Sequence, residues 1–267
     1  MGVIRGLLVV VGSVLLFLSL LSVTFFWVSS SSLNYENLQD SAPSVIMDFL
    51  EEVNVTSIID SNYNLIQTYC NSSYANSNYV FKEGNYTFDI PCESVSQGRD
   101  TMVQEGVKNI LYKIYYTEYN CNFFDCLKVS PFFLISERAY NYLDAKFYFF
   151  LFVSFILIIA LFLFIEKKTN TFILTGSLMI ISALIFVKID SFFALFYDKI
   201  FFRILGIFFS QSFSVSVSLF ITGIILLMIG FIFKIFRIGF KISGLISKLK
   251  TIEKTPSVKK GKRTKSK

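Results

Sequence analysis

The chain has 267 residues, of which 54% are hydrophobic and only 16% are charged. Soluble proteins average about 25% charged residues, so a water-soluble globular protein is excluded because it could not bury this much apolar surface. The net charge of +6 hides an asymmetry: residues 30–146 carry 15 acidic and 7 basic side chains, whereas residues 234–267 carry 12 basic and one acidic. Lys and Arg are retained on the cytoplasmic side of membrane proteins, so the basic tail is expected inside the cell.

The first apolar run, residues 6–28, contains 23 uncharged residues after Arg5 and carries Trp27 near its end. At a helical rise of about 1.5 Å per residue, the run is long enough to cross the hydrocarbon core of a bilayer. It is also longer than the apolar core of a cleaved signal peptide. Residues 1–29 are therefore predicted to form a retained signal-anchor span with a cytoplasmic N-terminus, and cleavage near residues 29–32 is the alternative.

The polar segment 30–146 holds all four cysteines, which are Cys70, Cys92, Cys121 and Cys126. An even number of cysteines confined to one acidic segment predicts two disulfides in an oxidising compartment. Three pairings are possible, and the local pairing of Cys70 with Cys92 and Cys121 with Cys126 is favoured. A metal site is disfavoured because the chain has no histidine. The Cys-x4-Cys spacing of Cys121 and Cys126 also has no matching second pair of cysteines to complete a zinc site.

The same segment is expected to fold as a small external α+β domain with two or three helices. Ser41-Ala42-Pro43 is typical of a helix start, and another amphipathic helix is predicted after Gly98. Residues 79–90 alternate in polarity as a hairpin does, with Gly84-Asn85 at the turn. Three sequons in this segment make the following asparagines candidates for glycosylation: Asn54, Asn71 and Asn85.

The second predicted span, residues 147–166, begins with nineteen uncharged residues and leads into Glu166-Lys167-Lys168. Residues 136–146 contain no helix breaker, which predicts one continuous helix entering the membrane. The short basic loop is expected in the cytoplasm, and the third span is predicted at residues 171–188. Its small residues pair seven positions apart, Thr175 with Ser182 and Gly176 with Ala183, which favours a close-packed face.

Residues 189–211 are apolar enough to span but carry three charges in their middle, Asp198, Lys199 and Arg203. If this stretch crossed the membrane, the basic tail would lie outside. It is therefore predicted to be an interfacial or re-entrant helix on the external side. With Lys188 and Asp190, these side chains form an interfacial charge cluster, which is interpreted as local charge compensation; lining of a vestibule in an oligomer is the alternative.

The fourth span is predicted at residues 212–236, where Ser216, Gly223 and Gly230 recur every seven positions. Residues 237–267 form a basic tail that is expected to be disordered and to contact anionic lipid head groups. Nucleic acid is not an expected partner, because the tail lacks interleaved aromatic residues and a folded binding motif. The predicted fold is thus a membrane α-helical protein of four spans, with the external domain between the first two.

No residue pattern typical of catalysis is found in the sequence. Without histidine there is no Ser-His or Cys-His nucleophile pair, and no phosphate-binding or dinucleotide glycine motif is present. We therefore expect a non-enzymatic plasma-membrane protein without a cofactor, whose external domain contacts an unknown protein or a second copy of itself. The alternative is an oligomeric channel or transporter component that passes an ion or small solute.

The order of one span, a disulfide-bearing external segment and three further spans is similar to the topology of claudin-type adhesion proteins. The external segment lacks the tryptophan and the Gly-Leu-Trp motif of that family. Three short stretches resemble uncharacterised four-span membrane proteins of archaeal genomes: Ile90-Pro91-Cys92-Glu93, Tyr115-Tyr116 with Tyr119-Asn120-Cys121, and Glu166-Lys167-Lys168-Thr169-Asn170. The resemblance implies the topology and no particular activity.

Overall fold

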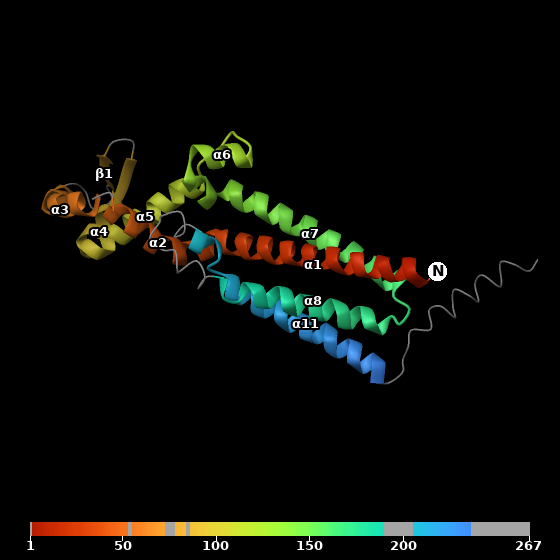
Figure 1. Cartoon of the computed structure of the whole chain (residues 1–267). Coiled ribbons are helices and arrows are strands. Elements are labelled where there is room, and N and C mark those ends of the chain that lie inside the picture. Colours follow the sequence, from red (N-terminus) through yellow and green to blue (C-terminus); the bar gives the residue numbers. More distant parts are fainter. Residues whose placement is uncertain (1, 53–54, 73–77, 84–85, 190–204, 236–267) are drawn as a thin grey trace, which may run out of the picture.

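The computed structural model describes residues 2–52, 55–72, 78–83, 86–189 and 205–235. Four long helices lie beside one another, and a smaller domain caps one end of them (Figure 1). The long helices are α1 (Gly2–Leu33), α7 (Glu137–Phe164), α8 (Thr169–Phe186) and α11 (Ser212–Ile235). By length and composition all four can cross a membrane, so the chain is a membrane protein.

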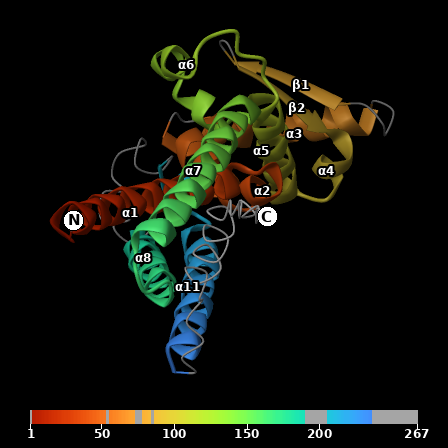
Figure 2. The same cartoon turned by 90° about the vertical axis from the view of Figure 1, so that its right-hand side faces the viewer.

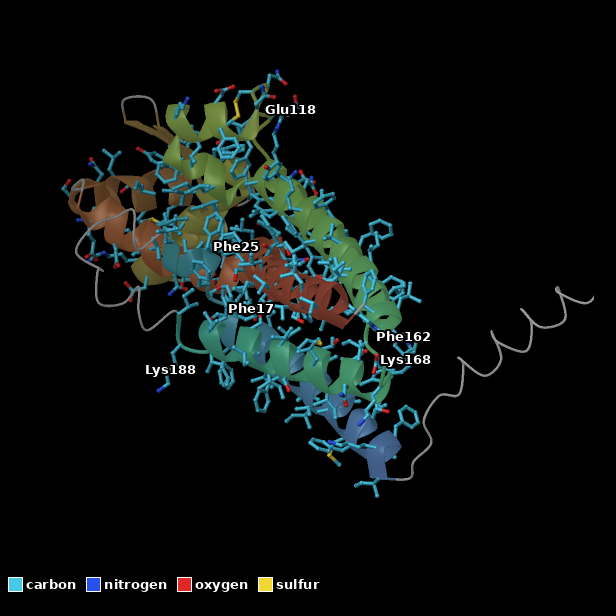
Figure 3. The ribbon with its side chains drawn as sticks, turned by 45° about the vertical axis from the view of Figure 1, so that its right-hand side comes forward. Phe17, Phe25, Glu118, Phe162, Lys168 and Lys188 are labelled. Atoms are coloured by element: carbon cyan, nitrogen blue, oxygen red, sulfur yellow. A yellow bond between two sulfur atoms is a disulfide. The ribbon has the colours of Figure 1, made fainter. Side chains whose placement is uncertain are left out.

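The helices pack as two antiparallel pairs, α1 with α7 and α8 with α11 (Figure 2). Figure 3 shows Phe25 and Lys188 toward the domain end of the bundle, and Phe162 with Lys168 at the opposite end. The end of α8 and the start of α11 therefore both lie at the domain end. Residues 190–204, which make up most of the stretch predicted to be an interfacial or re-entrant helix, lie outside the described residues, so that interpretation stays a prediction.

The α8–α11 pair is built on the glycines that recur in its sequence. A Cβ atom added at Gly176 would lie 2.7 Å from the carbonyl oxygen of Gly223, and one added at Gly230 would lie 2.7 Å from a side-chain carbon of Ile173. Ordinary van der Waals contact starts at 3.4 Å, so only glycine fits at these positions. Thr175 and Ser216 are buried beside these glycines. The small-residue faces predicted for both spans are where the two helices meet.

Helix α1 is joined to its neighbours by hydroxyl pairs. The Oγ atoms of Ser19 and Ser154 lie 2.8 Å apart between α1 and α7, and Thr24 Oγ1 lies 2.8 Å from Ser182 Oγ between α1 and α8. All four side chains are buried. Hydrocarbon offers no water to these hydroxyls, so the hydrogen bonds between them take the place of hydrogen bonds to water. These small polar residues therefore join α1 to its neighbouring helices.

The cysteine-bearing domain contains a two-stranded antiparallel sheet packed on helices. Strands β1 (Asn78–Glu83) and β2 (Tyr86–Pro91) form the predicted hairpin, and its turn at residues 84–85 lies outside the described part of the chain. The helices of the domain are α2 (Tyr35–Glu52), α3 (Val55–Ser72), α4 (Cys92–Ser96), α5 (Arg99–Tyr115), α6 (Phe123–Val129) and the 3₁₀ helix η1 (Pro131–Ile135).

Domain and bundle share one hydrophobic core. Leu33 at the end of α1, Leu38 on α2 and Phe133 on η1 are fully buried in the same cluster as Phe209, which precedes α11. The Oγ atom of Ser32 also accepts a hydrogen bond of 3.0 Å from the backbone N–H of Gln211. The domain is therefore docked directly on the bundle. The expectation of one continuous helix leading into the membrane agrees with α7, which begins at Glu137 and ends at Phe164.

The predicted start of the first domain helix at Ser41-Ala42-Pro43 is wrong, because α2 begins at Tyr35 and has Pro43 in its interior. An interior proline costs a helix about 3 kcal/mol through its missing N–H donor and its ring. Here Leu38, Ala42 and Ile46, spaced four residues apart on one face of α2, are buried in the shared core. Packing of this face stabilises the helix across the proline. Helix α3, which follows α2, was not located from the sequence.

Candidate interaction surface

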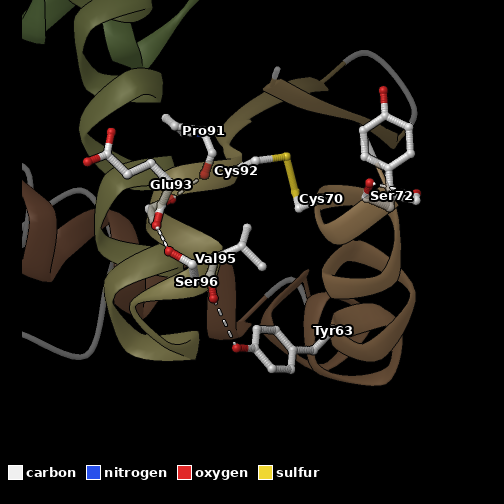
Figure 4. The surroundings of a disulfide bond; sticks show 10 residues. Tyr63, Cys70, Ser72, Pro91, Cys92, Glu93, Val95 and Ser96 are labelled. Carbon is white, nitrogen blue, oxygen red and sulfur yellow. Dashed lines mark hydrogen bonds between the residues drawn. A yellow bond between two sulfur atoms is a disulfide. The ribbon is translucent and has the colours of Figure 1, made fainter. Parts of the chain in front are cut away.

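The two disulfides join neighbouring elements of the domain. Cys70 at the end of α3 pairs with Cys92 at the start of α4, with Cα atoms 5.2 Å apart (Figure 4). Cys121 pairs with Cys126 on α6 at a Cα separation of 5.5 Å. This is the pairing favoured from the sequence. Near the first disulfide, the Tyr63 hydroxyl donates a hydrogen bond of 3.4 Å to the Val95 carbonyl, which also links α3 to α4.

A shallow pocket of about 410 Å³ lies beside the Cys70–Cys92 disulfide. It is lined by polar side chains that include Gln67, Asn71 and Glu93. Within the described part of the chain, no group of three or more His, Cys, Asp or Glu side chains is placed to hold a metal ion. In the described lining, the Ser96 hydroxyl donates a hydrogen bond of 2.6 Å to the backbone carbonyl of Glu93.

Of the three asparagines in sequons, only Asn71 lies in the described part of the chain. Its side chain is exposed near the end of α3, at the rim of the pocket. Asn54 and Asn85 lie outside the described residues, and glycosylation stays a prediction for all three. Of the interfacial charge cluster, Lys188 is described and exposed, whereas Asp190, Asp198, Lys199 and Arg203 lie outside the described residues.

A cluster of four tyrosines lies where the end of α5 meets the start of α2. Tyr35 begins α2, Tyr112 and Tyr115 lie on the last turn of α5, and Tyr116 caps that helix. Each ring centroid is 4.7–6.1 Å from a neighbouring one, with the planes tilted or edge-on. Tyr115 is buried and supports the others, whereas Tyr112 is 54% and Tyr116 44% exposed. We call these four residues the tyrosine patch.

The patch forms because α5 ends opposite the start of α2. Tyr112 and Tyr116 are four residues apart at the end of α5, so their rings are neighbours on one face of the helix, with centroids 4.7 Å apart. The side chain of Asn34 accepts a hydrogen bond of 3.0 Å from the backbone N–H of Glu36, which caps the start of α2. This cap holds Tyr35 at the first position of the helix, where its ring contacts all three tyrosines of the α5 end.

The chemistry of the patch is neutral and aromatic, with a carboxylate nearby. Burial raises the pKa of the Tyr115 hydroxyl above its usual range, and the charge of Glu137 raises it further. Tyr115 therefore stays protonated at physiological pH. Glu137 is exposed at the start of α7, so it adds a negative charge beside the rings. An aromatic surface flanked by a carboxylate favours cationic groups, which can contact both.

The carboxylate beside the patch lies well before the uncharged stretch of α7. Glu137 precedes the uncharged part of α7, which starts at Phe147, by ten residues, or about 15 Å along the helix. Head groups add only about 5–8 Å to each side of the hydrocarbon core. Measured along α7, Glu137 thus lies farther from the uncharged stretch than the head-group layer is thick.

The tyrosine patch was not identified as a site from the sequence. Tyr115-Tyr116 entered only as part of a resemblance, and Tyr35 is separated from Tyr112 by 76 residues of chain, so no local pattern connects them. The spacing of Tyr112 and Tyr116 on an amphipathic helix was the available signal. It identifies an aromatic face, and the position of α2 relative to α5 then completes the cluster.

Comparison of the chain with protein families, curated proteins and solved structures finds no match. The resemblances to claudin-type and archaeal four-span proteins accordingly stay predictions. The architecture defines a class: a membrane protein with four candidate spans and a disulfide-stapled domain between the first two.

Proposed function

We propose that the protein is a non-enzymatic membrane protein whose cysteine-bearing domain binds another protein through the tyrosine patch. The observation that carries this proposal is the exposure of Tyr112 and Tyr116 on a rigid support, since tyrosine is enriched at the energetic centres of protein interfaces. Rings already held by Tyr35 and Tyr115 lose little conformational freedom on binding, which favours affinity.

The partner is a protein that presents Lys or Arg side chains at the patch. Glu137 beside the rings and the excess of 15 acidic over 7 basic residues in segment 30–146 both support a basic partner surface. Cation–π contacts with tyrosine contribute about 0.5–2 kcal/mol each. The same negative charge opposes contact between two copies of the domain, so a different protein is favoured over self-association.

In the proposed topology the domain faces the outside of the cell and both termini are cytoplasmic. Three features support this orientation. The domain holds two disulfides. Basic residues lie elsewhere, with Lys167 and Lys168 at the opposite end of the bundle and 12 Lys and Arg residues in segment 234–267. The protein then belongs to the plasma membrane. A membrane-impermeant amine label applied to sealed cells is expected to modify the domain and to spare Lys262, and labelling of Lys262 would overturn the orientation.

Site-specific photo-crosslinking in intact cells tests the contact. A photoreactive phenylalanine analogue in place of Tyr112 is expected to yield one discrete covalent adduct, and Tyr116→Ala is expected to lower its yield. The matched control carries the same analogue at Tyr69, which is also an exposed tyrosine of the domain, 42% accessible on α3. An identical set of adducts at both positions, or none at Tyr112, contradicts the proposal. An adduct of twice the mass of the protein identifies a second copy as the partner.

Passage of an ion or solute is the competing function. The polar positions in the uncharged stretches of the four long helices are serine and threonine hydroxyls, Asn170 and the aromatic residues Trp27 and Tyr148. The buried hydroxyls of Ser19 and Thr24 on α1 are paired with neighbouring helices. These features favour packing over conduction. Reconstitution of the full chain into liposomes with a flux assay separates the two functions, because selective flux would refute the contact role as the main activity.

A further inference from the structure

A groove runs along the side of the bundle, separate from the tyrosine patch. It has a volume of about 740 Å³, which is within the usual range for ligand pockets. All four long helices line it: Trp27 comes from α1, Tyr148 from α7, Met179 from α8, and Leu219 from α11. The groove is partly open on its outer side, and its surroundings in a membrane protein are lipid.

The groove extends along the bundle over about the thickness of one leaflet. On α7 its lining runs from Phe147 to Ile158, eleven residues further on, which corresponds to about 16 Å along the helix. The hydrocarbon core of a bilayer is about 30 Å thick, so this is close to half of it. Trp27 and Tyr148 lie at the domain end of the groove, and such aromatic residues favour the level of the head groups.

Away from Tyr148 at the domain end, the hydroxyl groups in the described lining belong to Ser154 and Thr222, and both already have hydrogen-bond partners. Ser154 Oγ lies 2.8 Å from the Oγ of Ser19, and Thr222 Oγ1 donates a hydrogen bond of 2.9 Å to the carbonyl of Ser218. A polar solute in the groove would lose hydrogen bonds to water without replacement, at a cost of several kcal/mol. A hydrocarbon chain has no such loss.

The groove also differs from the contact between α8 and α11. The α8–α11 contact depends on Gly176 and Gly223, whose missing Cβ atoms let the two backbones approach closely. The α7 wall of the groove instead presents large side chains, Phe147, Leu151 and Phe155. Large side chains keep a partner helix at a distance but leave room for a thin, flexible chain.

We propose that this groove binds a hydrocarbon chain of a membrane phospholipid from the leaflet on the domain side, with its head group near Trp27 and Tyr148. Three features fit such a chain: the length of the groove along the bundle, the hydrogen-bonded hydroxyls of Ser154 and Thr222, and the large side chains of the α7 wall. The site is independent of the contact function proposed for the domain.

Lipid retention and tryptophan fluorescence test the site in the full chain. Thr222→Phe places a ring in the groove from an exposed position on α11, and Ile221→Phe is the matched control, because Ile221 is 51% exposed and outside the lining. The protein is purified in mild detergent from phosphatidylcholine vesicles, and native mass spectrometry counts the phosphatidylcholine that stays bound. In parallel, vesicles of chain-brominated phosphatidylcholine quench Trp27, the one tryptophan of the chain.

We expect wild type and Ile221→Phe to retain one phosphatidylcholine, and Thr222→Phe to retain at least about fivefold less and to show weaker quenching of Trp27. Phe152→Ala, which removes an exposed part of the outer wall, is expected to lower retention as well. Equal retention in wild type, Thr222→Phe and Ile221→Phe overturns the proposal. A dimer that wild type forms and Thr222→Phe abolishes also overturns the proposal, because the groove would then be a docking site for a helix of a second copy.

Discussion

Substitution of Gly176 by alanine tests whether the close approach of α8 and α11 holds the bundle together. The added Cβ would lie 2.7 Å from the carbonyl oxygen of Gly223 and 2.9 Å from the backbone nitrogen of Leu227. The first distance is 0.7 Å shorter than the 3.4 Å of ordinary contact, and both atoms belong to the backbone of the partner helix. No side-chain rotation can relieve the clash, so the two helices must move apart.

The expected loss of stability follows from two opposing effects. Overpacking of a well-packed contact costs about 1–3 kcal/mol. Alanine in place of a helical glycine contributes about 0.5–1 kcal/mol in the other direction. We therefore expect Gly176→Ala to lower the free energy of unfolding by about 1–2 kcal/mol. The measurement is equilibrium unfolding in mixed micelles by titration with a denaturing detergent, followed by far-UV circular dichroism.

Two glycines of α1 supply graded controls. A Cβ at Gly6 has no atom within 4 Å, so Gly6→Ala is expected to be neutral or slightly stabilising. A Cβ at Gly12 would lie 2.9 Å from the Cδ2 atom of Leu161, which is the end of a flexible side chain and can move aside. Gly12→Ala should therefore have an effect between those of Gly6→Ala and Gly176→Ala. Equal stability of Gly6→Ala and Gly176→Ala would refute the reasoning.

Three further predictions concern the domain and the α1 contacts. Replacing Cys70 and Cys92 by serine is expected to lower the free energy of unfolding by about 3 kcal/mol, since the disulfide closes a loop with a sequence separation of 22, and reductant should abolish the difference from wild type. A double-mutant cycle of Ser19→Ala and Ser154→Ala is expected to show a coupling of about 0.6 kcal/mol, and additive losses would contradict the hydrogen bond. The raised pKa of Tyr115 means that the folded state holds the phenolic proton more tightly than the unfolded state does, so this stability is fully present below the usual tyrosine pKa near 10 and is lost as the pH rises above it. Tyr115→Phe should therefore flatten the decline in stability measured between about pH 10 and pH 12.

Much of the bundle could be predicted from the sequence because lipid imposes simple rules. An uncharged stretch long enough to cross the core forms a helix, and glycines seven residues apart mark where Gly223 and Gly230 meet α8. The disulfide pairing was also favoured, since local pairs close short loops. Each of these features depends on residues close together in the chain.

The errors arose where distant residues decide the structure. A local rule placed a helix start at Pro43, whereas burial of Leu38 and Ala42 in the shared core extends α2 through it. The tyrosine patch was missed for a related reason, because Tyr35 and Tyr112 meet only after α2 docks on α5. The groove has the same origin, since its lining comes from all four long helices.

The shared core restricts how the domain can work. Only Asn34 separates α1 from α2, and its backbone N–H donates to the carbonyl of Ser30 at 3.0 Å, which continues the helical hydrogen bonding of α1. On the other side, α7 runs without a break from Glu137 at the tyrosine patch to the wall of the groove. With two helices joining domain and bundle and no linker between them, the domain cannot swing freely. A protein that binds the patch is therefore held at a defined height and orientation over the membrane, which suits a partner that is itself anchored in the same bilayer.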